Sequence, residues 1–269
     1  MSAMRVGIGG LGAIGWPVMV RLVEGIDGLT LAAVSAADLE RATRRLAEAS
    51  IEVPVVPAAS LADHADVVVE CLPAAGFRSI AVPTLTAGRT LMTLSVGALL
   101  TNMDLVDLAR ANGGRVHVPT GALVGLDAVR AAAQGTIHDV RMETRKPPRG
   151  LVGAPYLEAN DIDVMALTTP TCVFTGTARE AALGFPANLN VAAALALAGV
   201  GPERTRLEIW ADPGVTRNTH TIHVDADSTR FTLAIEGVPS EANPRTGKLT
   251  PLSVLAALEG LVSPLRVGT

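Results

Sequence analysis

The sequence is short of cysteine and of net charge. Its 269 residues include only two cysteines, Cys71 and Cys172, whose separation fits neither a metal-binding nor a redox motif. We therefore expect no metal site and a reducing, cytoplasmic location. The formal net charge of -4 is mild, and it gives no indication of a nucleic-acid partner.

Long apolar runs and aromatic residues are scarce as well. The longest apolar stretch predicted to be helical, residues 191–201, is too short to span a bilayer. The N-terminus runs directly into a predicted strand with no signal peptide before it, so we expect no membrane partner. Apolar residues make up 49% of the chain and aromatics only 3%, which indicates a sizeable core that is mostly aliphatic.

A glycine-rich turn near the N-terminus organises the rest of the chain. The spacing G-x-G-x-x-G occurs in two overlapping frames, and we favour Gly10, Gly12 and Gly15 because a buried strand then precedes them. In this frame Gly10 makes the tight turn, Gly12 lets the backbone approach a pyrophosphate, and Gly15 lets the helix pack closely. Ala13 and Ile14 lie at the helix start, whose unpaired N–H groups would face the phosphates. The alternative is a glycine-rich turn without a ligand.

From residue 4 to about residue 120, predicted strands and helices alternate. The alternation predicts an α/β fold with a doubly wound parallel sheet, that is, an N-terminal Rossmann domain of residues 1–120. A helix is expected at 38–49, and residues 101–104 predict a capping box before a later helix. Strands are expected at 5–9, 29–35, 66–72, 90–95 and 115–119.

The pattern changes after residue 121. It predicts a second, α+β domain over residues 121–240, with a mostly antiparallel sheet and helices on one face. A last apolar helix, 251–261, lies in the C-terminal segment 241–269 and is expected to pack back on the first domain. Helices are expected at 125–134, 177–183 and 190–198, and strands at 139–145, 206–210, 219–225 and 230–236.

The end of the second strand bears on the choice between NAD and NADP. An acid is expected there to bind the adenosine ribose of NAD. Ser35 occupies that place, Asp38 comes slightly late, and Arg41 and Arg44 follow. Asp38 could contact a ribose or could simply cap the helix. NAD is therefore not cleanly specified, and NADP stays open.

Three further turns follow the third, fourth and fifth predicted strands, where ligands of an open parallel sheet bind. Each turn alone has no functional meaning, but together with the glycine loop they outline one site whose backbone groups could hold a ribose and a nicotinamide. The candidate cofactor residues in these turns are Cys71, Leu72, Pro73, Ser95, Gly97 and Ala122.

His220 is the leading candidate for catalysis. It lies in a predicted strand, where the period of two puts His220 and His223 on opposite faces. A histidine with a near-neutral pKa can take a proton from an amine or a water molecule. The alternative is a histidine that is satisfied inside the sheet. We take His64, His117, His138 and His223 as structural or exposed.

Cationic and polar residues near these segments could bind substrate carboxylates. Arginine binds a carboxylate bidentately, although a surface role is the commoner one for any single residue. Asn188 and Asn190 flank a helix start, where N-capping competes with a contact to cofactor or substrate. The candidates for binding carboxylates are Lys146, Arg149, Arg217, Asn218 and Thr219.

Several segments together resemble the L-aspartate dehydrogenases. They occur in the same order over nearly the whole chain. The glycine loop is generic, whereas the P-x-N-x-N-V and N-T-H segments are much more specific. The segments are 10–15, 95–99, 121–128, 144–148, 174–181, 185–192, 218–220 and 243–246.

The resemblance implies a Rossmann domain, a second α/β domain, NAD or NADP as cofactor, and a homodimer. It also implies that Ala122 and Asn190 touch the cofactor and that His220 is catalytic. The expected reaction is the reversible oxidative deamination of L-aspartate to oxaloacetate and ammonia through iminosuccinate, with His220 as general base. Ser35 departs from the acid expected of an NAD site and leaves the cofactor preference open.

Two other functions are compatible with this fold and cofactor, because a fold alone does not decide function. One is a reductase that acts on another small imine or semialdehyde. The other is a non-catalytic protein that senses dinucleotides and binds NAD(H) tightly without turning over aspartate. The N-T-H segment and the cationic loop after residue 145 argue against the second of these.

Overall fold

A computed structural model describes residues 3–186, 189–241, 243 and 246–268 of the chain. Asn188, and Pro244 and Arg245 of the last family-like segment, lie outside these residues. Contacts divide the chain into two compact units: unit 1 is residues 1–121 with 250–266, and unit 2 is residues 122–249 with 267–269. No helix in the described ranges is long and apolar enough to cross a bilayer.

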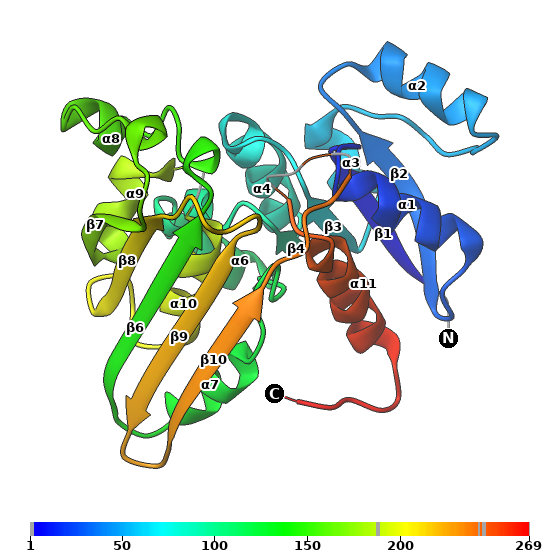
Figure 1. Cartoon of the computed structure of the whole chain (residues 1–269). Coiled ribbons are helices and arrows are strands. Elements are labelled where there is room, and N and C mark those ends of the chain that lie inside the picture. The colour runs from blue at the N-terminus through cyan, green and yellow to red at the C-terminus, as the bar shows by residue number, and fades with distance from the viewer. Residues whose placement is uncertain (1–2, 187–188, 242, 244–245, 269) are drawn as a thin grey trace. The chain divides into compact units, whose positions relative to one another are not determined.

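Unit 1 is built on a five-stranded sheet in the order β2-β1-β3-β4-β5, of which Figure 1 labels β2, β1, β3 and β4. Every neighbouring pair is parallel, which confirms the predicted doubly wound α/β fold. The inner strands are buried apolar runs because helices cover both faces. The strands are β1 (Met4–Gly9), β2 (Leu29–Ser35), β3 (Val67–Glu70), β4 (Thr90–Thr93) and β5 (Arg115–His117).

Helices pack on both faces of this sheet. One buried cluster joins Ile8 and Val69 of the sheet to α1, α2 and α11. A second cluster joins Val68, on the other face, to Leu61 of α3 and Ile80 of α4. The helices that pack in this unit are α1 (Gly15–Glu24), α2 (Leu39–Glu48), α3 (Leu61–His64), α4 (Phe77–Thr86), α5 (Val96–Leu100), α6 (Asp104–Asn112) and α11 (Leu249–Val262).

Two predicted helix starts have different outcomes. The Asp38 carboxylate caps α2 by accepting a hydrogen bond of 2.8 Å from the N–H of Arg41. The predicted capping box at residues 101–104 is wrong, and α6 begins without a side-chain cap. The reason is that α5 ends at this point, and the Thr101 hydroxyl donates to the Ala98 carbonyl of that helix at 2.9 Å.

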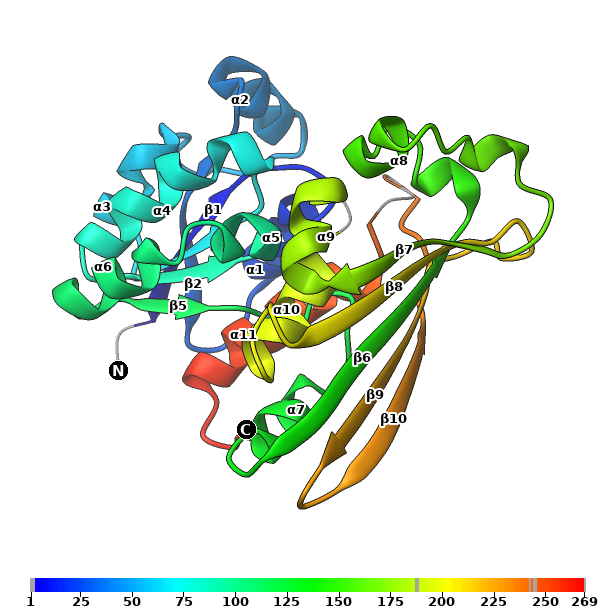
Figure 2. The same ribbon diagram turned by 90° about the vertical axis from the view of Figure 1, so that its left-hand side faces the viewer.

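Unit 2 contains a second five-stranded sheet in the order β10-β9-β6-β8-β7 (Figure 2). All neighbours are antiparallel except β6 and β8, which confirms a mostly antiparallel sheet. The sequence analysis missed β7, where a register shift between Cys172 and Phe174 interrupts the alternation. The strands are β6 (Ile137–Lys146), β7 (Thr171–Thr177), β8 (Thr205–Ala211), β9 (Thr219–Ala226) and β10 (Arg230–Glu236).

One face of the second sheet, here called the inner face, is covered by helices that include α7 and α10 (Figure 2). Alternation along the strands buries Met142 of β6 and Ile222 of β9 on this face. Helix α9 begins with a capping box in which Thr177 and Glu180 bond reciprocally. The helices are α7 (Leu126–Ala132), α8 (Pro155–Ala159), α9 (Ala178–Gly184) and α10 (Asn190–Ala198).

The packing of α11 on unit 1 can be tested by Leu258→Ala. Leu258 is fully buried in the cluster that includes Ile8, and a cavity of this kind costs about 2–5 kcal/mol of the free energy of unfolding. Leu252→Ala is the matched control, because Leu252 lies in the same helix and is 57% exposed; a change of about 0.5 kcal/mol or less is expected. Denaturant unfolding measures both, and equal losses would contradict this packing.

Candidate active site

The glycine loop between β1 and α1 has the geometry that its sequence frame predicts. Gly10 has φ +102°, and a Cβ there would lie 2.6 Å from the Cys71 carbonyl oxygen. A Cβ on Gly15 would lie 1.8 Å from the Gly10 carbonyl oxygen, whereas one on Gly12 would meet nothing within 4 Å. The N-cap residue of α1, Ile14, makes no side-chain cap bond. The loop therefore fits a pyrophosphate, which needs open space and backbone N–H donors.

Gly10 and Cys71 meet where the strand order reverses. Strand β1 lies between β2 and β3, and open sheets bind ligands outside the carboxyl ends of the strands at such a point. The N–H of Gly10 donates to the Ser35 carbonyl at 2.8 Å, and the N–H of Cys71 donates to the Gly9 carbonyl at 2.8 Å. The structure thus brings three predicted cofactor segments together within unit 1.

A buried carboxylate lies under these turns, and the sequence analysis did not single it out. Glu70, the last residue of β3, is 0% exposed. It accepts hydrogen bonds from the Leu72 N–H at 2.9 Å and the Thr93 hydroxyl at 2.7 Å. Ser95 donates to it twice, from its N–H at 3.1 Å and its hydroxyl at 2.9 Å. The sequence feature that could have identified Glu70 is an acidic residue at the carboxyl end of an apolar strand.

The segment after β2 offers a fixed cation near the glycine loop. Ser35 is buried, and Asp38 is engaged in capping α2. Arg45, an exposed residue of α2, stacks over the Trp16 ring at 3.5 Å and donates to the Leu11 carbonyl at 2.9 Å. This guanidinium is held on the loop, so a positive charge lies beside the glycine loop, and Ser35 occupies the end of β2 where an NAD-selective site has an acid.

The other predicted cofactor residues are spread over both units. Pro73 is exposed after β3, and Gly97 lies in the first turn of α5. Ala122 is half-buried at the start of unit 2, and Asn190 is the exposed first residue of α10.

In unit 2, β6 and β9 carry a buried polar cluster on the inner face. His220 is 4% exposed and pairs in register with Thr144 of β6. Thr144 Oγ1 and His220 Nδ1 share a hydrogen bond of 3.1 Å, in which the ring nitrogen can donate or accept. The predicted opposite orientation of His223 is confirmed, because that ring bonds the Thr232 hydroxyl at 3.0 Å on the outer face.

Lys146 lies on the same inner face, two residues along β6 from Thr144. The sequence predicted a loop at this point, but β6 continues through Lys146, whose side chain is 6% exposed. Burial lowers the pKa of Lys146 from 10.5 to about 8. Burial, together with the charge of Lys146, lowers the pKa of His220 to about 3. The ring is therefore neutral near pH 7, unlike the near-neutral titration expected of an ordinary histidine.

Of the five residues predicted to bind carboxylates, the structure joins only Lys146 to this cluster within the described ranges. Arg217 is exposed, and its guanidinium lies 3.9 Å from a glutamate carboxylate. Thr219 faces away from the inner face, because it directly precedes His220 in β9. Asn218 precedes the strand, and Arg149 is exposed in the 3-10 turn Pro148–Gly150.

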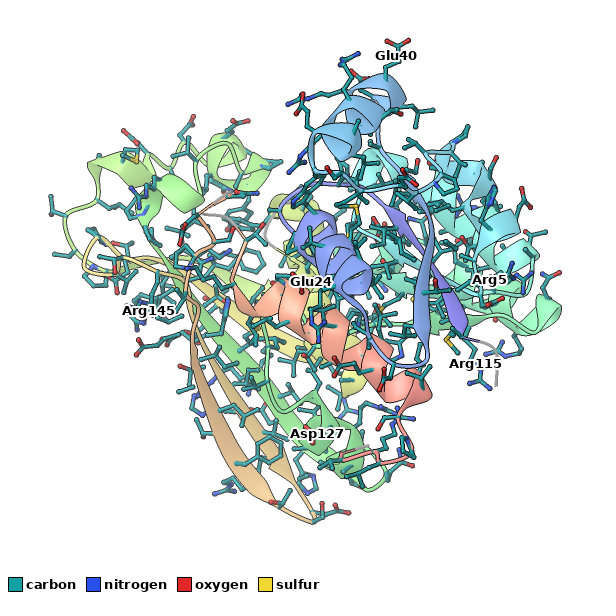
Figure 3. All side chains as sticks on the ribbon, turned by 90° about the vertical axis from the view of Figure 1, so that its right-hand side faces the viewer. Arg5, Glu24, Glu40, Arg115, Asp127 and Arg145 are labelled. Atoms are coloured by element: carbon teal, nitrogen blue, oxygen red, sulfur yellow. The ribbon has the colours of Figure 1, made fainter. Side chains whose placement is uncertain are left out.

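The neighbouring cation, Arg145, is already paired on the outer face (labelled in Figure 3). Its guanidinium bonds Glu143 at 2.6 Å, lies 3.4 Å from Asp212 and stacks on Trp210 at 4.5 Å. The hydrogen bond that Arg145 donates to Glu143 is the main cause that raises the pKa of Arg145. We therefore assign Arg145 a structural role in the sheet. No group of three His, Cys, Asp or Glu side chains in the described part of the chain could hold a metal ion.

Comparisons with known proteins agree with this picture in both units. The family model described as "Aspartate dehydrogenase, C-terminal" matches residues 127–261. The model described as "Homoserine dehydrogenase, NAD binding domain" matches residues 10–119. The chain therefore combines a dinucleotide-binding unit with a second unit of one particular family.

Full-length relatives carry the same name. The chain is 55% identical to the L-aspartate dehydrogenase of Bradyrhizobium diazoefficiens, over 100% of this chain and 95% of that relative. It is 51% identical to L-aspartate dehydrogenase 3 of Bordetella bronchiseptica, over 99% and 98%. The crystal structure of aspartate dehydrogenase from Thermotoga maritima matches with a TM-score of 0.73 and 26% identity, over 98% of this chain and 99% of that one.

Gly12 and Gly15 make a matched pair for testing the geometry of the loop. Gly15→Ala places a methyl group inside the contact distance of the Gly10 carbonyl and should cost about 1–3 kcal/mol of stability. Gly12→Ala should leave the melting temperature unchanged, because its Cβ meets no atom, and should weaken NADH binding by filling the approach to the backbone. Thermal unfolding and NADH fluorescence titration measure the two effects. Unchanged affinity in a folded Gly12→Ala variant would contradict the cofactor assignment.

Proposed function

The chain belongs to the L-aspartate dehydrogenase family, and from this premise we propose how it oxidises its substrate. L-Aspartate loses a hydride from its α-carbon and a proton from its α-ammonium group to give protonated iminosuccinate, and water then releases oxaloacetate and ammonia. A bound nicotinamide supplies the hydride acceptor, while the protein supplies orientation and charge. The observation that carries the proposal is the buried cluster of Thr144, His220 and Lys146.

His220 is the proton acceptor in this proposal. The Thr144 hydroxyl occupies Nδ1, so Nε2 is the nitrogen that would take a proton from the α-ammonium group or from the attacking water. A ring with a pKa of about 3 is neutral and ready to accept, but it holds a proton weakly. A dicarboxylate bound beside the ring raises its pKa, since a nearby negative charge favours the protonated form. Substrate binding therefore makes His220 a stronger base.

Lys146 supplies the positive charge for a substrate carboxylate. Burying a carboxylate without a donor or a cation is costly, and Lys146 is a cation on the same buried face as His220. With a pKa of about 8, its amine is mostly protonated at pH 7 and mostly neutral at pH 9. Dicarboxylate binding should follow this titration.

Either NAD or NADP serves as the cofactor in this proposal. The buried Ser35 at the end of β2 and the guanidinium of Arg45 on the glycine loop support acceptance of NADP as well as NAD. We also propose a homodimer, which sedimentation would test, and a cytoplasmic location, which the two free cysteines support.

One alternative is favoured by a specific match. The likeness of residues 10–119 to the NAD-binding domain of homoserine dehydrogenase suits a reductase of another small imine or semialdehyde. NAD(P)-linked rates with aspartate, homoserine and a simple amine separate these functions. Tight NAD(H) binding without turnover of any of them would indicate a dinucleotide-sensing protein.

His220→Ala should lower kcat by about 10²–10⁴-fold, the usual contribution of general acid–base help. The assay follows reduced-nicotinamide absorbance with oxaloacetate plus ammonia, comparing NADH with NADPH. His223→Ala is the matched control, because His223 lies in the same strand and bonds Thr232 on the other face. Its rate should stay near that of the wild type. Near-normal turnover by a folded His220→Ala variant would remove this residue from the mechanism.

Lys146 should impose a pH dependence on dicarboxylate binding. Because the pKa of Lys146 is lowered, its amine is a cation below about pH 8 and is neutral above it. Succinate stays doubly ionised above pH 7, so its inhibition constant should rise as the pH passes 8. Bound succinate shifts this midpoint upward. In Lys146→Met, inhibition should be weaker and flat between pH 7 and 10. A wild-type constant that does not change over this range would contradict the role of Lys146.

A further inference from the structure

Glu70 is a buried carboxylate that the proposed mechanism does not use. It is 0% exposed and lies at the carboxyl end of β3. Its bonding partners in the described ranges are neutral: the Leu72 N–H, the Thr93 hydroxyl, and the N–H and hydroxyl of Ser95. Four donors match the acceptor capacity of an ionised carboxylate, which has two oxygens and no proton to donate.

These bonds join two turns of the cofactor site. Leu72 belongs to the turn after β3, and Ser95 belongs to the turn after β4. The Ser95 hydroxyl also lies 3.1 Å from the Leu72 carbonyl oxygen. Glu70 therefore fixes the distance between the two turns, and the close approach of Gly10 to Cys71 ties them to the glycine loop.

The position of Glu70 in the sheet gives its charge a second consequence. Strands β3 and β4 lie beyond the point where the strand order reverses, in the half of a doubly wound sheet that takes the second nucleotide of a dinucleotide. A nicotinamide ring carries a positive charge when oxidised and none when reduced. A buried anion acts strongly on nearby charges because the surrounding dielectric is low. Burial and the charge of Glu70 also raise the pKa of the Cys71 thiol in the adjoining turn.

We propose that Glu70 is a positioning residue of the dinucleotide site, which ties the turns after β3 and β4 together and whose charge favours the oxidised cofactor over the reduced one. The inference rests on the nicotinamide cofactor of the proposed function. Tighter binding of the oxidised form makes the bound reduced form a better hydride donor. The site would thereby favour reduction of the imine on the enzyme.

Glu70→Gln tests the charge. A glutamine has the same shape as the glutamate, but its NH₂ group cannot accept a hydrogen bond. One backbone N–H therefore loses its partner, whereas the hydroxyls of Thr93 and Ser95 can rotate and accept a hydrogen bond from the NH₂ group. The dissociation constants of NAD⁺ and NADH are measured by calorimetry on the full chain. The ratio of the NADH constant to the NAD⁺ constant should fall by about tenfold, as expected for loss of one charge near a partly buried cation.

Two controls keep the charge and remove bonds. Ser95→Ala deletes one hydroxyl donor, and Glu70→Asp sets the carboxylate back by one methylene group. Both should weaken NAD⁺ and NADH binding in parallel and leave the ratio unchanged. If Glu70→Gln does not fold, the controls still test the proposal, because a charge-retaining variant that shifts the ratio by tenfold would overturn it.

The remaining outcomes separate this inference from the proposed function. Wild-type protein that binds neither cofactor form would remove both. Wild-type protein that binds cofactor and turns over aspartate, with the same ratio in a folded Glu70→Gln variant, would overturn the role of the Glu70 charge alone. A ratio that falls in Glu70→Gln and holds in both controls supports the proposal.

Discussion

Each unit of this chain buries an ionisable side chain at its functional end, although such burial costs free energy. In unit 2, lowering the pKa of Lys146 from 10.5 to about 8 corresponds to roughly 3 kcal/mol against the charged amine. A methionine of similar length would avoid it. The sequence contains only two lysines, Lys146 and Lys248, so a buried lysine does not follow from a lysine-rich composition. A cost of this size, carried beside a histidine, points to function rather than to stability.

The two units meet the same constraint in different ways. Glu70 is surrounded by four neutral donors, and the bonds that they make to its carboxyl group also fix two turns. Lys146 lies on the buried inner face with His220, and burial lowers the pKa of its amine. A fully bonded anion makes a rigid support, whereas an amine with a lowered pKa can gain or lose a proton near working pH. The first arrangement suits cofactor binding and the second suits a substrate that carries charge.

The sequence predicted the parts of the structure that depend on local patterns. Glycine spacing located the turn at Gly10, and apolar runs located all strands of the parallel sheet. Bonds between distant residues were not predictable, because strand register depends on packing: Thr144 and His220 are 76 positions apart, and Glu70 and Ser95 are 25 apart. Strand β7 was missed because its register shift breaks the alternation. His220 itself was singled out by its strand context and the family resemblance.

The chemical role of His220 depends on its environment, because a histidine side chain can act either as a cation or as a base. An imidazole with an ordinary pKa near 6.5 would be partly protonated near pH 7; it would then attract a carboxylate and could not accept a proton. The charge of Lys146 and the buried face remove that state. Anion binding is left to the amine and proton transfer to the ring, so the two tasks do not compete. Because a bound dicarboxylate offsets the positive charge of Lys146, the ring gains basicity only after the substrate is in place, and substrate binding has to precede proton transfer.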